Sequence, residues 1–468
     1  MAWIGGLALL IFAFSGLMHP LMSWTTPMPA AFFPPQTQIS ASDVKSVGYI
    51  LKENKIKQAQ MVKIVPLNDN AVLQVTENQT LPRRYFDLNT YQELSDYDKK
   101  YALWLGRYYT GFADIAVKNV TFQTEFSDDY PWVNRLLPVY KIEFDTPDNR
   151  TVFIHTELSS MTGMTNNYKN ILQSVFQTLH TWDWVTGAGG NIRIILMMTL
   201  LISLTVMGIS GTLLTFVMQK RKIADAKRRF HRRFAYFIFI PVIALSISGI
   251  YHLLQMNYGD NIRGFKINPA FLIKQEQLNA KIDFETQKFN GLNMVSYNGD
   301  ILYRLSVPAG HGDDSVSRTQ KYAGVVTDKN SIFIDAKTGK ISDINDMDMV
   351  KYYAQKHLNI TDSDIKNINI ITNFSTDYDF RNKRLPAYQV NMVSRDIAFI
   401  DPATGALIDS VKTTAQYEGF IFAHLHKGNF MVPFLGRFGR DVLIVIILIM
   451  SIISTILGYK MLIKKKKG

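Results

Sequence analysis

The sequence predicts an α-helical membrane protein with four transmembrane helices in two repeats and two α+β extracytoplasmic domains. The chain has 468 residues, of which 47% are hydrophobic, so it is long enough for several domains. The hydrophobic residues concentrate in four runs, each near the roughly 20 residues that a helix needs to cross a bilayer. The positive charge concentrates in two short segments beside these runs. Both observations are typical of a multi-pass membrane protein.

The hydrophobic runs define the expected domain boundaries. They cover residues 3–24, 194–218, 234–256 and 442–462. The first run lacks the basic start and small-residue cleavage site of a signal peptide, so we expect it to remain as a helix. The expected helical segments are 1–24, 191–219, 234–256 and 439–462. The segments between them are an outer domain at 25–190, a basic loop at 220–233, a second outer domain at 257–438 and a basic tail at 463–468.

The basic segments predict the orientation of the chain. Residues 219–233 hold eight Lys/Arg and one Asp, and residues 459–468 hold five Lys and no acid. Their charges of +7 and +5 equal the whole net charge of +12. Such segments remain on the cytoplasmic side, so both termini are expected inside and both large domains outside, in the periplasm of a bacterial inner membrane. The positive charge is therefore a topology signal, and no nucleic-acid partner is expected.

The chain contains no cysteine, which excludes disulfides, a covalently attached c-type haem and cysteine-ligated iron–sulfur clusters. The motifs of serine and zinc hydrolases and of phosphate- or dinucleotide-binding loops are also missing from the sequence. A redox cofactor would therefore be held by His, Met, Tyr or carboxylates.

Three pairs of short segments indicate that the chain repeats itself. SGLMH (15–19) matches SGIYH (248–252), VFQTLH (175–180) matches IFAHLH (421–426), and RLLPVY (135–140) matches RLPAYQ (384–389). Each half then reads as a span, an outer domain and a second span. Functional sites in membrane proteins tend to lie between such halves.

The repeat predicts that four histidines gather at the outer face of the membrane. His19 and His252 lie near the outer ends of spans one and three, and His180 and His426 lie just before spans two and four. Neutral imidazole is a common ligand of iron, and a haem can join two separate helices through axial histidines. Gly16 and Gly249 lie three residues before their histidines, on the same helix face, and would leave room for a porphyrin edge. Packing of neighbouring helices is the other explanation for small residues there.

Four other residues have possible roles at a haem. Arg193 and Arg440 lie at the outer mouths of spans two and four, where a guanidinium would bind haem propionates or extend to water as an ordinary helix-end side chain. His231 opens the third span, about 32 Å along the helix from His252, and is either an inner-face ligand or a basic interfacial residue. His424 adjoins His426, but the first half has Thr178 there.

The outer segments read as mixed α/β modules. Residues 41–54 and 350–360 have the apolar spacing of amphipathic helices. The stretches AYQVNM (387–392) and DIAFID (396–401) alternate as strands do, and DAKTG (335–339) and DPATG (401–405) suit turns. His155, His311 and His357 are interpreted as structural or surface residues.

These motifs together resemble the PepSY-associated transmembrane family. They are Leu-His before a span, Arg-Arg-x-His-Arg (228–232), SGxxH at a helix end and Asp-x-x-Thr-Gly turns. The resemblance covers essentially the whole chain and implies PepSY-like outer domains. It also implies one or two b haems and an oxidoreductase activity that reduces a ferric siderophore or another Fe(III) chelate in the periplasm. Because no flavin or nicotinamide module is recognised, the electrons are expected from a membrane quinol or a separate donor protein.

Two other classes of function are compatible with the sequence. In the first, the outer domains of a binding or regulatory protein recognise a partner, and the histidines are structural or sense pH. In the second, the chain is a transporter and the histidines relay protons. A b haem would distinguish these classes from a reductase, because its absorption band shifts on reduction.

Overall fold

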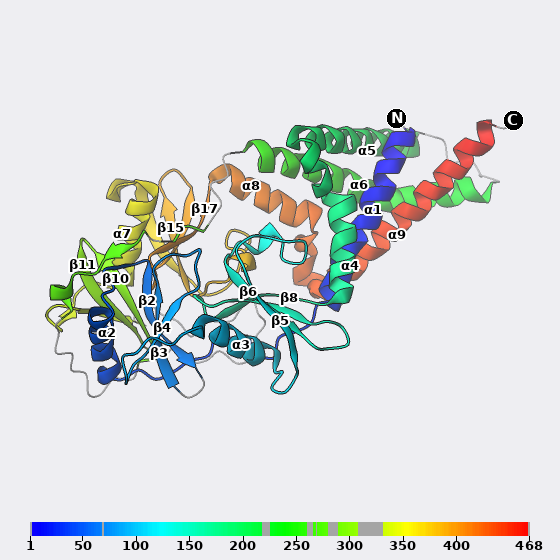
Figure 1. Cartoon of the computed structure of the whole chain (residues 1–468). Coiled ribbons are helices and arrows are strands. Elements are labelled where there is room, and N and C mark those ends of the chain that lie inside the picture. Colours follow the sequence, from blue (N-terminus) through cyan, green and yellow to red (C-terminus); the bar gives the residue numbers. More distant parts are fainter. Residues whose placement is uncertain are drawn as a thin grey trace. The chain divides into compact units, whose positions relative to one another are not determined.

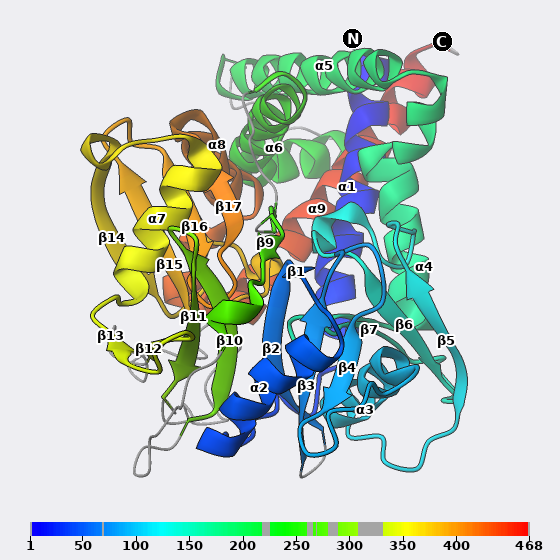
Figure 2. The ribbon, with the colours of Figure 1, turned by 60° about the vertical axis from the view of Figure 1, so that its left-hand side comes forward.

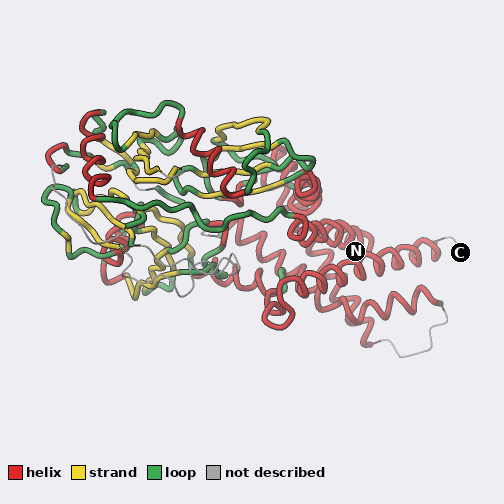
Figure 3. The backbone as a smooth tube through the Cα atoms, turned by 90° about the horizontal axis from the view of Figure 1, so that it is seen from below, coloured by secondary structure: helices red, strands yellow, loops and turns green. Residues whose placement is uncertain are grey.

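The computed structural model describes residues 2–67, 70–217, 225–259, 265–267, 269–278, 289–307 and 331–466. The chain divides into two compact units. Unit 1 comprises Met1–Thr26, Asn167–Asn261 and Thr414–Gly468, and unit 2 comprises Pro27–Asn166 and Ile262–Thr413. Figure 3 shows that unit 1 is built of helices and that unit 2 contains the strands.

Unit 1 is a bundle of four long helices with two shorter helical segments. Four of its helices are long and apolar enough to cross a membrane, which confirms the four predicted spans (Figure 1). The long helices are α1 (Ala2–Thr25), α5 (Gly190–Val217), α6 (Ala226–Tyr258) and α9 (Val432–Lys466). The shorter segments are α4 (Asn167–Phe176) followed by η2 (Gln177–Thr181), and α8 (Thr413–Ile421) followed by η7 (Phe422–His426).

The long helices of unit 1 pack around an apolar centre. Helix α1 packs against α5 and α9, and α6 packs against the same two helices. Small residues permit this close approach: a Cβ on Gly5 would lie only 2.8 Å from the carbonyl oxygen of Ser203. Several serines are buried inside the bundle. Their hydroxyls bond to backbone carbonyls one turn earlier, as Ser451 does to Ile447 at 2.8 Å, which satisfies polar groups in an apolar medium.

Unit 2 contains three principal antiparallel sheets and a small strand pair (Figure 2). The central sheet has seven strands in the order β13-β12-β11-β10-β2-β3-β4, and the two flanking sheets have the orders β5-β6-β7-β8 and β14-β15-β16-β17. The strands of the first segment are β1 (Gln58–Ala59), β2 (Met61–Leu67), β3 (Asn70–Thr76), β4 (Arg84–Asp87), β5 (Val117–Gln123), β6 (Val139–Phe144), β7 (Thr151–His155) and β8 (Ser160–Thr165). Those of the second segment are β9 (Phe271–Leu272), β10 (Gly291–Tyr297), β11 (Asp300–Ser306), β12 (Ser331–Asp335), β13 (Ile341–Ser342), β14 (Ile365–Ile371), β15 (Ala387–Met392), β16 (Ile397–Asp401) and β17 (Ala406–Val411).

The central sheet joins the two outer segments of the chain. Strand β10 pairs with β2 in antiparallel register, with Leu292 opposite Ile64 and Met294 opposite Val62. Residues far apart in the sequence thus share one hydrogen-bonded sheet and one hydrophobic core. The two outer segments, which were expected to be separate domains, are thus parts of one compact unit.

Helices cover both faces of the central sheet. Helix α2 (Ala41–Glu53) buries Val44, Val47, Ile50 and Leu51 against one face. Helix α3 (Tyr97–Thr110) shares a core with β2, β3, β4 and the sheet β5–β8, and α7 (Asp346–Leu358) shares one with β10, β11, β12 and the sheet β14–β17. Each of these two helices therefore lies between two sheets, which leaves little of its surface exposed to water.

Several sequence expectations for unit 2 are confirmed. Helices α2 and α7 fall on the predicted amphipathic stretches, and strands β15 and β16 fall on AYQVNM and DIAFID. Both helices begin with a capping box, made by Ser40 with Asp43 and by Asn345 with Asp348, which satisfies free backbone amides. His155 ends β7 and His357 lies on α7, as expected. His311, part of the basic loop and the end of the basic tail lie outside the described residues.

Candidate functional site

Two short helical segments of unit 1 position His180 and His426. Helix α4 continues into the π-helical turn η2, which contains His180, and α8 continues into the π-helical turn η7, which ends at His426. Such widened turns are rare and are frequent at functional sites. Residues in the left-handed conformation follow each turn, Trp182 at φ 55° and Gly428 at φ 64°. The backbone reverses there and leads into α5 and α9.

The serine of each SGxxH motif anchors one of these histidines. The Oγ of Ser15 lies 2.9 Å from Nδ1 of His180, and the Oγ of Ser248 lies 3.2 Å from Nδ1 of His426. Each hydroxyl also donates to a carbonyl of its own helix, Ser15 to Ile11 at 2.7 Å and Ser248 to Leu245 at 3.1 Å. A hydroxyl has one proton, so it accepts from Nδ1–H of the imidazole. The lone pair of each ring is then on Nε2, the atom that is left to bind a metal.

His252 has a different partner, the carboxylate of Glu418. Its Nδ1 lies 2.5 Å from Oε1 of Glu418, and Glu418 is only 2% exposed. A buried carboxylate needs such a partner because an unpaired charge in this environment is costly. Aligning VFQTLH with IFAHLH places Leu172 at the position of Glu418. The carboxylate is therefore a feature of the second half alone.

Aromatic rings connect the four predicted histidines in one series. Phe176 contacts His19 at 6.3 Å between ring centroids and stacks on His180 at 4.7 Å. Phe422 stacks on His426 at 4.6 Å and on His252 at 4.0 Å. His180 and His426 contact each other edge to face at 6.3 Å. Among the described residues, this is the only direct contact between two of these rings. The structure thus brings together all four predicted residues, with the two lead-in histidines at the centre.

Burial keeps the two central imidazoles neutral. It lowers the pKa of His180 to about 4, and the nearby His19 and His252 act in the same direction. Burial also lowers the pKa of His426 to about 3, with further contributions from His180 and His252. The neutral imidazole is the form that binds a metal.

The residues present fit a haem in three respects. A haem iron needs only two axial ligands, and His180 and His426 are two histidines whose rings contact each other edge to face. A bare metal ion usually needs three or more protein ligands, and the described residues contain no group of three His or acidic side chains close enough to provide them. The Nε of Arg193 is buried without a hydrogen-bond partner, so a donor remains available for an anionic group such as a propionate.

Both arginines also have protein partners. Arg193 donates to the backbone oxygen of Thr181 and to Asp183, each at 3.1 Å. Arg440 donates to Asp441 through Nε at 2.9 Å and through Nη2 at 2.6 Å, and through Nη1 to Asn429 at 2.5 Å. A propionate at Arg440 would therefore compete with a carboxylate that is already in place, whereas Arg193 keeps the unpaired Nε.

The two glycines differ in their surroundings. A Cβ on Gly249 would meet Leu201 at 3.6 Å and the ring of His426 at 3.8 Å. Gly249 thus faces one of the central histidines. A Cβ on Gly16 would meet only Leu448, at 3.5 Å. Gly249 was expected to leave space beside His252, which lies on the same helix. In the structure, the histidine ring next to Gly249 is that of His426.

The two less certain histidines lie apart from this series. Nδ1 of His231 is 2.9 Å from both the hydroxyl and the backbone oxygen of Ser454 on α9. His424 stacks on Phe420 at 4.1 Å, and its Nδ1 lies 2.9 Å from the backbone oxygen of that residue. Each ring thus has a local partner, and neither contacts one of the four clustered histidines.

Sequence reasoning did not assign roles to Ser15, Ser248, Glu418, Phe176 and Phe422. The serines and phenylalanines stand inside the repeated motifs, so their repetition was an available signal. Glu418 is the only acidic residue of the lead-in 414–426, and an isolated carboxylate near a membrane span was a second such signal.

Comparisons with known proteins add no assignment. No family model matches the chain, and no similar curated protein or solved structure was found.

Proposed function

We propose that this chain is a b-type haem protein of a bacterial inner membrane that passes electrons to a ferric chelate, such as a ferric siderophore, and releases Fe(II) on the periplasmic side. The observation that carries the proposal is the pair His180 and His426, whose ring centroids lie 6.3 Å apart in an edge-to-face contact and whose Nδ1 atoms are each anchored by a serine. Metal-ligating histidines are typically oriented through their second ring nitrogen in this way. The resemblance to the PepSY-associated transmembrane family, with its two repeats and PepSY-like outer domains, supports the same function.

The residues divide into ligands and supports. His180 and His426 would hold one haem, and His19 and His252 are the remaining ligands available to a second. A bound haem would supply one-electron transfer. Ser15 and Ser248 orient the central rings, and the apolar helices around them exclude water. Arg193 offers its unpaired Nε to a propionate.

The substrate class follows from the chemistry of iron release. Siderophores and similar chelators use hard oxygen ligands, which hold Fe(III) much more tightly than Fe(II). One electron added to the metal therefore weakens the complex and frees the ion. The electron would come from a membrane quinol or a separate donor protein.

The proposed orientation rests on the two basic segments. Reporter fusions at about residue 225 and after Lys467 should report cytoplasm, whereas fusions near residues 100 and 320 should report periplasm. The opposite pattern would place the candidate haem site on the cytoplasmic side and exclude reduction of a periplasmic chelate.

Purified protein provides the direct test. Its absorption spectrum should show a haem band that shifts on reduction with dithionite, and the His180→Ala and His426→Ala variants should lose haem while the protein remains folded. The reduced protein should be reoxidised by a ferric hydroxamate while Fe(II) appears in a chelating trap. A colourless wild-type protein, after expression with ample haem, would refute the proposal.

The pair formed by His252 and Glu418 favours a second candidate, a proton-relaying transporter. A buried carboxylate hydrogen-bonded to an imidazole within a bundle of spans is typical of proton pathways. In that case purified haem-free protein in liposomes should move protons in response to a gradient, and Glu418→Gln should abolish the movement. Haem content and proton flux are measured separately, so the two candidates are distinguishable.

A further inference from the structure

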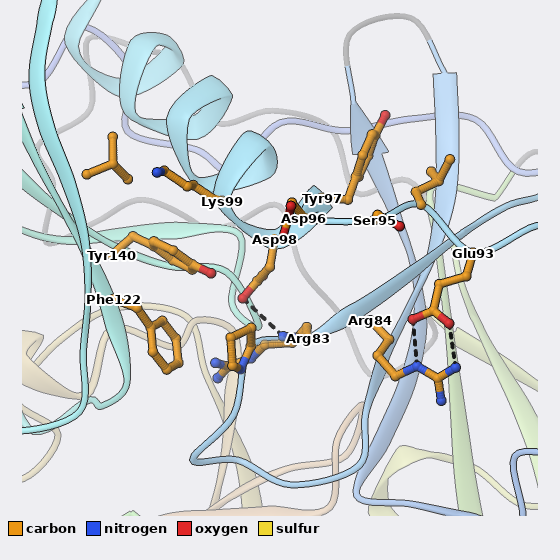
Figure 4. A pocket seen from close by; sticks show the side chains of 13 residues that line it. Arg83, Arg84, Glu93, Ser95, Asp96, Tyr97, Asp98, Lys99, Phe122 and Tyr140 are labelled. Carbon is orange, nitrogen blue, oxygen red and sulfur yellow. Dashed lines mark hydrogen bonds and ion pairs between the residues drawn. The ribbon is translucent and has the colours of Figure 1, made fainter.

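Unit 2 contains a cavity at the beginning of helix α3 that is distinct from the histidine cluster (Figure 4). Its volume is about 430 Å³, within the range of small-molecule sites. The first turn of α3, the segment that leads into β4 and the sheet β5–β8 line it. The walls combine aromatic rings, including Phe122 and Tyr140, with charged groups, including Arg83 and Lys99.

Arg83 is a buried cation without a carboxylate partner. Its residue surface is only 5% exposed, and its Nε is buried with no hydrogen-bond partner. Its guanidinium makes only a long contact, 3.4 Å from Nη1 to the backbone oxygen of Leu81, and no ion pair of Arg83 occurs among the described residues. Figure 4 shows this side chain directed toward Phe122. A guanidinium remains charged at all ordinary pH values, so its burial without an anion is unfavourable.

The ion pairs nearest to Arg83 do not include its guanidinium. Behind it, Lys63 and Arg384 are matched by two carboxylates: Arg384 pairs with Glu157 at 2.7 Å and with Asp401 at 2.8 Å, and Lys63 donates to the backbone oxygen of Glu157. Lys63, Arg83 and Arg384 together lower the pKa of His155, although burial has the largest effect, so this residue is neutral. Asp98 supplies a third carboxylate nearby, but its two oxygens accept from the backbone N–H of Arg83 and from the hydroxyl of Tyr85, so the guanidinium of Arg83 itself has no carboxylate partner.

Of the three carboxylates that line the cavity, Asp98 and Glu93 are already engaged, and the third, Asp96, immediately precedes α3. Oδ2 of Asp98 accepts the backbone N–H of Arg83 at 3.0 Å, and Oδ1 accepts the hydroxyl of Tyr85 at 2.8 Å. Glu93 pairs with Arg84 through both oxygens, at 2.7 and 2.6 Å. Arg84 thus has the carboxylate partner that its neighbour Arg83 lacks.

The amino end of α3 adds a second feature that favours an anion. Its N-cap residue, Asp96, is in the left-handed conformation (φ 56°) and makes no side-chain capping bond. The free N–H groups of a helical first turn and the helix dipole both attract negative charge. This first turn lines the cavity together with the unpaired guanidinium.

The amino end of helix α7 also combines a first turn with a buried arginine, but there both have partners within the protein. Asn345 caps α7 with a complete capping box, and the buried Asp346 in its first turn receives Arg304 through two bonds of 2.7 Å. The hydroxyl of Tyr388 also lies 3.2 Å from Asp346. The arginine, the carboxylate and the cap are therefore all satisfied within the protein at α7. At α3 the cap is missing and the arginine is unpaired.

We propose that the cavity at α3 binds a small organic carboxylate with a flat, apolar body. The carboxylate pairs with Arg83 at the first turn of α3, and the body lies against Phe122 and Tyr140. The bidentate geometry of a guanidinium matches a carboxylate, and the aromatic walls favour a planar group over a fully hydrated inorganic anion. This site depends on neither the histidine cluster nor a haem.

The test uses the full chain in detergent with benzoate as the probe. Binding is measured by calorimetry and by the rise in the thermal unfolding midpoint, because a ligand that binds only the folded state stabilises it. Benzoate should bind, and benzamide, which has a similar shape without the charge, should not. Arg83→Met should weaken benzoate binding about 10- to 100-fold, as expected for loss of a charge-assisted hydrogen bond. The control Arg150→Met should retain it, because Arg150 pairs with Asp148 at 2.8 Å and neither residue lines the cavity.

The thermal stability of the variants and the choice of probe provide further tests of the carboxylate site. Without probe, Arg83→Met should unfold at the wild-type temperature or above, because it removes an unpaired buried charge. A large fall in that temperature would show that Arg83 is a structural ion partner and would overturn the proposal. Equal binding of benzoate and benzamide, or binding of inorganic phosphate in preference to benzoate, would also overturn it. Arg83→Lys is a second variant: it keeps the charge, loses the fork geometry and should bind benzoate more weakly than the wild type.

Discussion

Replacing Glu418 is expected to loosen haem more than replacing Ser248. Glu418 is 2% exposed and its Oε1 lies 2.5 Å from Nδ1 of His252, whose side chain is 36% exposed. The carboxylate makes the bond charge-assisted, and water reaches it only from the side of the imidazole. Losing such a bond costs about 1.5–3 kcal/mol, whereas losing a neutral hydrogen bond costs about 0.5–1.5 kcal/mol. The bond of 3.2 Å between Ser248 and His426 is a neutral hydrogen bond. These energies correspond to roughly 10- to 150-fold for Glu418→Leu and roughly 2- to 13-fold for Ser248→Ala.

The assay is the rate at which haem transfers from the purified variants to excess apomyoglobin, followed by absorbance. Leucine is a suitable replacement because Leu172 occupies the corresponding position in the first half. Glu418→Gln keeps a hydrogen-bonding group without the charge and should fall between leucine and wild type. Equal haem loss from wild type and Glu418→Leu, with helix content unchanged, would refute the assignment of His252 as a ligand supported by Glu418. It would leave the pair His180 and His426 as a possible haem site.

Three further predictions concern stability and the helix interface. Arg384→Met should destabilise the protein by about 3–5 kcal/mol in denaturant unfolding, because Glu157 and Asp401 would stay buried without their cation, and adding Glu157→Gln should restore part of the loss. Burial lowers the pKa of Lys63 from 10.5 to about 8, so between pH 8 and 9.5 the folded state binds fewer protons than the unfolded state. The unfolding free energy should therefore rise with pH over this window, and a rise of equal size in Lys63→Met would contradict this origin. Gly249→Leu should lower haem per folded protein, because its side chain would enter the space of the His426 ring, whereas the control Gly211→Leu, with no neighbour within 4 Å of its Cβ, should not.

Local features of the fold were predictable from local sequence. The four spans follow from runs of apolar residues, and α2 and α7 follow from amphipathic spacing with a capping residue in front. The pairing of β2 with β10 was not predictable in this way. Leu292 and Ile64 are opposite each other because two strands far apart in the sequence pair in one sheet. The residues of either strand alone do not indicate which other strand it pairs with.

At the candidate site, too, the repeated motifs were predictable from the sequence, whereas the contacts between distant residues were not. Repetition of SGxxH and of the Leu-His lead-ins singled out the four histidines, because repetition is visible in a sequence. The contact of Phe176 with both His19 and His180 depends on how α4 packs against α1. Arg83 was overlooked for a related reason: Arg83 and Arg84 are adjacent in the sequence, and only the fold pairs one and leaves the other unpaired.

The differences between the two halves are as informative as their similarity. Ser15 and Ser248 give His180 and His426 the same kind of anchor, so these two rings have matched surroundings. His252 has a carboxylate, and in the sequence of the first half the position that corresponds to Glu418 is the apolar Leu172. A carboxylate on Nδ1 makes an imidazole a stronger electron donor to a metal and stabilises the oxidised state of an iron bound to it. In the proposed reductase, an iron bound to His252 would therefore have a lower reduction potential than one bound to His180 and His426 alone. A redox titration should resolve two haem components, and Glu418→Gln should raise the potential of the lower one only. A single component that does not shift in this variant would show that Glu418 does not act on a haem iron.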